Sequence, residues 1–174
     1  MARFDDCLHL ILNFEGGFSD DPADPGGATN LGIIQTEYDR YRDSIRQPRQ
    51  SVRGILESEA RAIYLASYWT PTHADYLAAP LDVVIFDTAV NNGTGTAIKW
   101  LQLALHVPAT GTFDTATSIA YHAVHADNIP LLASQLLDER VARYHALGDH
   151  GRLNRFLKGW LNRVASLKKW AGMS

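Results

Sequence analysis

The apolar residues of the chain recur mainly with the period of an α-helix. In residues 3–14, Phe4, Leu8, Ile11 and Leu12 recur at helical spacing, and two glycines follow. The same periodicity predicts further helices over residues 35–46, 57–69, 81–91, 94–106, 115–126, 131–147 and 152–170. No run alternates between apolar and polar residues over the length of a strand, so we expect a mainly α fold.

Residues 18–32 interrupt this helical pattern. They are rich in Asp, Pro, Gly, Ser and Asn, which favour turns and disfavour helix interiors. We therefore predict a small irregular loop or β-hairpin segment near the N-terminus. Loops held by a rigid scaffold often carry function, so this segment is the first place to look for chemistry.

The last predicted helix is amphipathic and basic. Its apolar positions follow i, i+3, i+4 spacing: Leu153, Phe156, Leu157, Trp160, Leu161, Val164 and Leu167. Residues 152–174 contain six Lys and Arg residues and no acid, whereas all 19 acidic residues precede them. We expect a closing helix of the fold rather than a membrane-inserted one, with a basic face available for electrostatic contact with an anionic cell envelope.

Composition excludes several classes of protein. Hydrophobic residues make up 46% and charged residues 20% of the 174 residues, which is typical of a globular protein. No apolar run is long enough for a transmembrane segment, and Asp5, Asp6 and His9 interrupt any signal peptide, so we expect synthesis in a cytoplasm. The single cysteine, Cys7, excludes an internal disulfide and reads as a core residue.

Two histidines on one helix, His122 and His125, are too few for a metal site without a third ligand. We predict no metal, no cofactor and no nucleic-acid partner, and we expect a monomer.

Glu15 is the strongest candidate for a catalytic acid. It is the last side chain before Gly16 and Gly17, so it is expected at the C-terminal end of the first helix, with Phe14 and Phe18 on either side. A negative helix end and apolar neighbours both favour the protonated acid. Such an acid can donate its proton to a leaving oxygen. The alternative is an exposed glutamate at a helix end.

Cleavage of a glycosidic bond also needs a second polar group opposite the acid. Asp24 lies nine positions after Glu15, and Thr29 lies five positions further on. Asp20 and Asp21 are alternatives, although both are more simply explained by turn formation before Pro22. The Asp spacing lacks the pattern of a calcium-binding loop and its distal Glu.

The same segment resembles the motif of glycoside hydrolase family 108. The resemblance covers Glu15-Gly-Gly-Phe and then Asp21-Pro-x-Asp-Pro-Gly-Gly-x-Thr-Asn-x-Gly-Ile33, and it continues in Tyr68-Trp69, Asp87-x-Ala-Val-Asn-x-Gly93 and Gly159-Trp-Leu-Asn-Arg163. Members of this family are N-acetylmuramidases, many of them phage endolysins, with a lysozyme-like helical fold. The resemblance implies a catalytic lobe over residues 1–90 and a helical peptidoglycan-binding-like lobe over residues 91–174, packed as one globular unit.

By the same resemblance, Glu15 carries over as the catalytic glutamate. The spacing to Asp24 and Thr29 is similar to the Glu–Asp–Thr arrangement of phage T4-type lysozymes, in which the threonine lies one position later, where this chain has Asn30. We therefore predict Asp24 and Thr29 as further catalytic residues and Asn30 as a substrate-binding residue. Whether the reaction inverts or retains the anomeric centre stays open.

Four more residues are candidates for substrate binding. Tyr68 and Trp69 can stack on a sugar face or pack in the core. Asp87 and Asn91 lie one helical turn apart and can bind N-acetyl groups or hold the catalytic loop in place, and the structural role is favoured.

The predicted function is hydrolysis of the β-1,4 bond between N-acetylmuramic acid and N-acetylglucosamine in peptidoglycan, for lysis of a phage host. Without a signal peptide, the enzyme is expected to reach the periplasm or cell wall through a holin-type pore. Three alternatives remain open: a lytic transglycosylase, a bacterial muramidase that assists protein export, and a non-catalytic wall-binding module.

Overall fold

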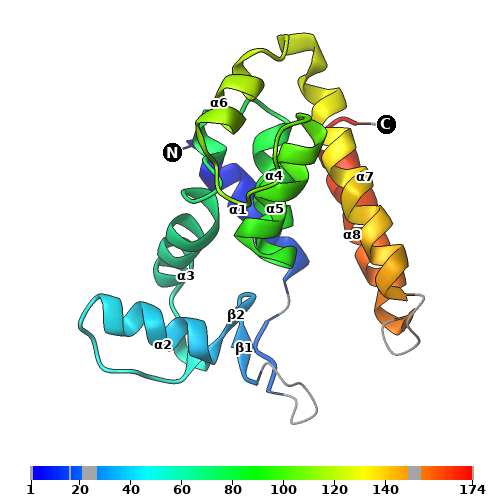
Figure 1. Cartoon of the computed structure of the whole chain (residues 1–174). Helices are drawn as coiled ribbons and strands as arrows, with labels where there is room; N and C mark the ends of the chain where they lie inside the picture. The colour runs from blue at the N-terminus through cyan, green and yellow to red at the C-terminus, as the bar shows by residue number, and fades with distance from the viewer. Residues whose placement is uncertain (1, 16, 21–26, 149–153, 174) are drawn as a thin grey trace. The chain divides into compact units, whose positions relative to one another are not determined.

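The computed structural model describes residues 2–15, 17–20, 27–148 and 154–173 (Figure 1). The α-helices are α1 Ala2–Phe14, α2 Gln35–Ser44, α3 Glu57–Tyr64, α4 Leu81–Asn92, α5 Thr94–Ala104, α6 Thr115–His122, α7 Ile129–Gly148 and α8 Asn154–Trp170. The strands are β1 Thr29–Asn30 and β2 Ile33–Ile34. The prediction of a mainly helical fold with a small hairpin near the N-terminus is confirmed.

Short helices of other types complete the secondary structure. They are the 3₁₀-helices η1 Val52–Gly54, η3 Ala74–Tyr76 and η4 Ala126–Asn128, and the π-helix η2 Leu65–Trp69. The predicted helix over residues 57–69 is therefore an α-helix that continues as a π-helix. The helix predicted to run to Ala126 ends at His122, because His125 adopts an extended backbone conformation and begins η4.

The chain divides into two compact units, residues 1–67 and 68–174. We call them the N-terminal and the C-terminal unit and describe each separately. The division at residue 90 concerns function and remains a prediction.

In the N-terminal unit, α1 buries the face that its periodicity predicted. Phe4, Leu8 and Ile11 are buried, together with Cys7, and Leu12 is half-buried. Strands β1 and β2 pair antiparallel, with Asn30 opposite Ile33. The loop between them has two residues, Leu31 at φ 50° and Gly32 at φ 73°. Positive φ at both central positions is typical of the type I′ turn, whose twist suits a tight hairpin.

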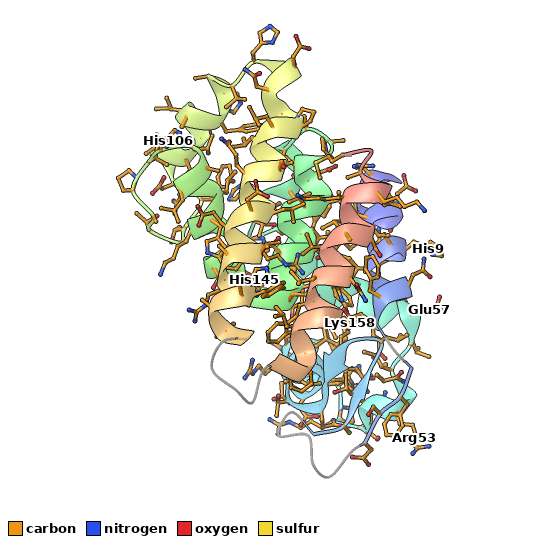
Figure 2. The ribbon with its side chains drawn as sticks, turned by 90° about the vertical axis from the view of Figure 1, so that its right-hand side faces the viewer. His9, Arg53, Glu57, His106, His145 and Lys158 are labelled. Carbon is orange, nitrogen blue, oxygen red and sulfur yellow. The ribbon has the colours of Figure 1, made fainter. Side chains whose placement is uncertain are left out.

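The C-terminal unit is organised around α4. All its residues from Leu81 to Ala89 are buried, as expected of a helix that is apolar on every side. Helix α4 packs against α5 and α7, and α7 packs in turn against α8. Both figures show α7 and α8 side by side as a helical pair (Figure 2).

The last helix uses its apolar face for this packing. Val164 and Leu167 are buried, and the Trp160 ring stacks on Tyr144 of α7 with 5.0 Å between centroids. This arrangement agrees with the prediction of a closing helix, although Phe156 stays 44% exposed. Among the described residues, no helix combines the length and the apolar character needed to cross a bilayer.

Candidate active site

Glu15 lies where the helical periodicity placed it, directly after the last residue of α1. Its backbone N–H donates to the carbonyl of Ile11 at 3.1 Å and so continues the helical hydrogen-bond pattern by one residue. The side chain is half-buried. Phe18, which follows in the motif, is also half-buried, and the Arg53 guanidinium lies 4.0 Å from the centre of its ring.

The Glu15 side chain packs against Gly32 of the hairpin loop. A Cβ atom built on Gly32 would lie 2.7 Å from Glu15 Cγ and 2.9 Å from Glu15 Cδ, and it would also overlap the Tyr64 hydroxyl. Two features therefore favour glycine at position 32. Its φ is positive, and the Glu15 and Tyr64 side chains approach so closely that they leave no space for a Cβ atom. The hairpin therefore places the bare backbone of Gly32 beside the side-chain carboxyl group of Glu15.

Tyr64 holds this hairpin loop in place. Its side chain is fully buried at the end of α3, and its hydroxyl donates to the carbonyl of Leu31 at 3.0 Å. Leu31 is itself at positive φ, a conformation that costs free energy for a residue with a side chain. The hydrogen bond from Tyr64 helps to stabilise that conformation next to Glu15.

Asn30 ties the hairpin to η1. Its amide nitrogen donates to the carbonyls of Val52 at 3.3 Å and Arg53 at 3.0 Å. Both donors therefore serve the fold. The predicted contact of Asn30 with substrate stays a prediction, and the structure gives the residue a role in fixing the hairpin.

Thr29 closes the loop that carries the predicted second carboxylate. Its backbone exchanges two hydrogen bonds with Ser19, both 2.8 Å long, and its hydroxyl donates to the Gly27 carbonyl at 3.2 Å. Asp24 lies between these paired residues but outside the described residues. The structure thus places Glu15, Thr29 and Asn30 in one unit, and the role of Asp24 stays a prediction.

A buried carboxylate supports α2 and α3 beneath this region. Glu59 accepts hydrogen bonds from the Tyr38 hydroxyl at 2.7 Å, from Arg42 at 2.7 Å and from the Leu56 N–H at 3.1 Å. Burial disfavours its charge, but these three donors outweigh that cost and hold the pKa of Glu59 below its ordinary value. Burial, and then the bond to Glu59, raise the pKa of Tyr38.

Tyr68 and Trp69 differ in exposure. Trp69 is buried, and its ring lies edge-on to Phe86 at 5.2 Å between centroids, so core packing accounts for it. Tyr68 is half-buried, and its carbonyl accepts a hydrogen bond from the Thr72 hydroxyl at 2.6 Å. Of the two, Tyr68 is the one with surface left for a ligand.

Asp87 lies in the core of the C-terminal unit. One carboxylate oxygen accepts from Arg140 Nη1 at 2.6 Å and the other from Arg163 Nε at 2.9 Å. Asp87 and Arg140 are fully buried. This geometry favours the structural role, and it explains why two distant pieces of the motif, around Asp87 and Arg163, occur together. Arg140 also donates to Tyr144 at 2.7 Å, and its Nη2 has no hydrogen-bond partner within the described part of the chain.

Asn91 follows one turn after Asp87 but faces outward. It is exposed, and its side-chain nitrogen donates to the Asp87 carbonyl at 2.7 Å near the C-terminal end of α4. Binding of substrate by Asn91 stays a prediction. The described ranges contain no cluster of His, Cys, Asp and Glu side chains that fits a metal ion.

The sequence did not reveal the roles of three residues of these sites. Gly32 lies in the motif around Glu15, but its position in a two-residue hairpin loop was not predicted, although glycine is typical of such loops. Tyr64 reads as an ordinary apolar position of a helix. Arg140 is of a residue type that is rarely fully buried, so nothing in the sequence distinguished it from a surface residue.

The chain is similar to known proteins in sequence and in fold. The model of the glycosyl hydrolase 108 family matches residues 8–93. The solved structure of SagA from Brucella abortus is 31% identical to the chain, with a TM-score of 0.81, over 98% of this chain and 94% of SagA. No curated protein shows significant similarity.

Proposed function

Because the chain belongs to the glycosyl hydrolase 108 family and is therefore a glycoside hydrolase, we propose that it hydrolyses the β-1,4 bond between N-acetylmuramic acid and N-acetylglucosamine in bacterial peptidoglycan. The family suggests peptidoglycan as the substrate. The particular bond is our inference from the motif around Glu15.

The observation that carries the proposal is the place of Glu15. A carboxylic acid at the end of α1 lies against the one hairpin position that cannot hold a side chain. We assign Glu15 as the general acid, which donates its proton to the glycosidic oxygen as the bond to the anomeric carbon breaks. Water supplies the new hydroxyl group, and the proton it loses passes to the second carboxylate if the reaction inverts or back to Glu15 if it retains. Asp24 or Thr29 is proposed to orient that water.

Replacement of Glu15 by Gln tests the assignment, because it keeps size and removes the proton. We expect the turnover of purified peptidoglycan to fall by about 10²–10⁴-fold, the usual contribution of general acid catalysis. Thermal unfolding should be nearly unchanged. A folded Glu15→Gln protein with activity close to that of the wild type would exclude Glu15 as the acid.

The products distinguish the reaction from its nearest alternative. Mass spectrometry of the muropeptides should find reducing ends that have gained one water. Anhydro sugars would instead identify a lytic transglycosylase, and wall binding without any product would identify a binding module. Asp24→Asn should lower turnover, and Asp20→Asn is the matched control from the same loop. A strong loss in Asp20→Asn alone would move the second role to Asp20.

For the biological role we propose lysis of a phage host. Expression in a bacterial cytoplasm should then lyse cells only when a holin-type pore is produced with it. The similar structure of SagA comes from a bacterium, so a muramidase that assists protein export is the alternative. Export defects in a deletion strain, without phage genes nearby, would favour it.

A further inference from the structure

A second candidate binding site lies in the C-terminal unit. A cavity of about 280 Å³ opens there, and five of its lining residues carry rings: His73, Tyr76, Phe113, Tyr121 and His122. Nothing in the motif around Glu15 or in the predicted substrate-binding residues involves these side chains. A cavity of this size suits a single sugar ring better than a peptide segment.

The walls of this cavity are fixed by the fold. The His73 and Phe113 rings stack with 4.6 Å between centroids. Tyr121 is buried, and its hydroxyl accepts from the Ala78 N–H at 2.7 Å. His73 is held at φ 54°, a left-handed conformation that is costly for a residue with a side chain and is often found at functional sites.

The Tyr76 ring at this cavity lies open to solvent. Tyr76 is 68% exposed, although burial of a tyrosine ring is favourable. Its ring lies 5.9 Å from that of His73, at an angle of 49°. An exposed aromatic side chain beside a preformed cavity is a typical contact surface for a flat ligand with one apolar face.

The remaining lining is polar and suits hydroxyl and amide groups. Thr115 and Ser118 contribute side-chain hydroxyls, and His122 contributes an imidazole. Asp114 adds a carboxylate, and hydrogen bonds from Thr117 and Thr110 hold its pKa below its ordinary value. A fixed negative charge disfavours phosphate-bearing polymers, so a neutral ligand with hydroxyl groups fits best.

We propose that this cavity is an accessory site for one N-acetylglucosamine ring, the neutral sugar of a peptidoglycan glycan strand, stacked on Tyr76 and hydrogen-bonded by Thr115, Ser118 and His122. The choice of a peptidoglycan glycan as the ligand rests on the proposed function. Because the site would hold a strand at a second point, it raises the effective concentration of long substrates only.

The first experiment maps binding in a full-length Glu15→Gln protein labelled for NMR. The probe is peptide-free glycan strands that an amidase has released from peptidoglycan. We expect chemical-shift changes at Tyr76, Phe113 and His122, and an affinity that falls about three- to tenfold in a Tyr76→Ala variant. Since Tyr76 is mostly exposed, this variant should fold normally.

Ile119→Ala is the matched control. Ile119 lies on α6, is 67% exposed and does not line the cavity. Equal binding of glycan strands by the Tyr76→Ala and Ile119→Ala variants would overturn the proposal, and so would shift changes that avoid the cavity. Binding of intact wall without binding of peptide-free strands would also overturn it, because the ligand would then be the peptide.

The second experiment separates this proposal from the proposed function. With Glu15 intact, Tyr76→Ala should raise the apparent KM for insoluble walls about three- to tenfold and leave kcat/KM for short soluble fragments unchanged. If glycan strands bind the cavity but no glycosidic bond is cut, the muramidase assignment fails and the accessory site stands. If glycosidic bonds are cut but glycan strands do not bind the cavity, the muramidase assignment stands and the accessory site fails.

Discussion

The two units of the chain stabilise their functional-motif residues in different ways. In the N-terminal unit, polar side chains supply partners to irregular backbone: Asn30 bonds two carbonyls of η1, Gln35 bonds Gln50 and Val52, and Tyr64 bonds Leu31. In the C-terminal unit, regular helices satisfy most of their own backbone, Tyr121 and Gln102 bond backbone groups of the connections, and the motif residue Asp87 lies in an ion pair inside apolar packing.

This difference indicates what each motif residue does. A short hairpin cannot bury enough apolar surface to fix its own geometry, so side-chain hydrogen bonds must do so where Glu15 needs a precise neighbour. Asp87 instead lies among packed regular helices, where a buried charge matters mainly for stability. Substitutions in the N-terminal unit should therefore lower activity, and substitutions at Asp87 should lower the free energy of unfolding.

The largest expected effect is that of Asp87→Ala. It leaves Arg140, which is fully buried, and Arg163 without their shared carboxylate. Loss of one partner from a buried ion pair typically costs about 3–5 kcal/mol of unfolding free energy. Urea unfolding should show a lower midpoint with an unchanged slope.

Asp138→Ala is the control for this variant. Asp138 is 67% exposed and lies 3.5 Å from Lys168, so its loss should cost no more than about 1 kcal/mol. If Asp87→Ala kept its stability and instead lost affinity for glycan fragments, Asp87 would bind substrate and the contrast between the units would fail.

Gly32→Ala should lower activity more than stability. The new Cβ would displace the Glu15 carboxyl group, from which it is built 2.7–2.9 Å away. A displacement of about 1 Å at a catalytic group can cost about 100-fold in rate. We expect kcat for short soluble fragments to fall by about 10–100-fold, measured as the release of reducing ends.

Gly27→Ala separates the effect of the contact with Glu15 from the effect of backbone strain. Gly27 also has a positive φ, 71°, but among the described residues a Cβ built there meets nothing within 4 Å. Both variants carry similar conformational strain, and only Gly32→Ala crowds Glu15. Equal losses of kcat in the two variants would show that strain alone matters and that Gly32 does not position Glu15.

Tyr64→Phe should lower kcat for short soluble fragments less than Gly32→Ala does. It keeps the ring and removes the hydrogen bond to Leu31. Such a bond contributes about 0.5–1.5 kcal/mol, so we expect kcat to fall severalfold as the hairpin loop loosens. Tyr144→Phe in the C-terminal unit removes the bonds to Arg140 and Asn92 and should lower stability without changing kcat. A loss of kcat in Tyr144→Phe, with none in Tyr64→Phe, would contradict the comparison, because the C-terminal unit would then control activity.

Much of the fold was predictable because helical periodicity is a local property. The helix predicted over residues 81–91 is observed as Leu81–Asn92, and the helix predicted over residues 152–170 as Asn154–Trp170. The position of Glu15 at the end of α1 followed from the glycines after it. These features depend on neighbours within a few residues, which the sequence displays directly.

The supporting contacts were not predictable in the same way. Asn30 bonds residues 22 and 23 positions away, and Arg140 bonds Asp87 across 53 positions. Such pairs depend on how the elements pack and on side-chain rotamers, which no periodicity encodes. Asn30 and Asp87 were therefore noticed as motif residues, while their partners η1 and Arg140 were not.

The smallest expected effect concerns the basic last helix. Its charges are partly used inside the C-terminal unit, since Arg163 pairs with Asp87 and Lys168 lies 3.5 Å from Asp138. Lys169 is exposed, as is Lys158, which Figure 2 shows on α8. We propose that these exposed charges assist the approach to anionic walls. Changing Lys158 and Lys169 to Gln should lower activity on whole walls severalfold at low salt.

Salt dependence and a matched variant decide whether that loss is electrostatic. Exposed charges are screened over about 8–10 Å near physiological ionic strength, so the deficit on walls should shrink as salt rises. Short soluble fragments should be cut at the wild-type rate, because the N-terminal unit is unchanged. Lys99 and Arg143 are exposed on α5 and α7, and changing both to Gln removes the same charge from outside the last helix. An equal loss in this control would assign the effect to net charge, whereas a loss on both substrates would mean that the last helix serves only the stability of its unit.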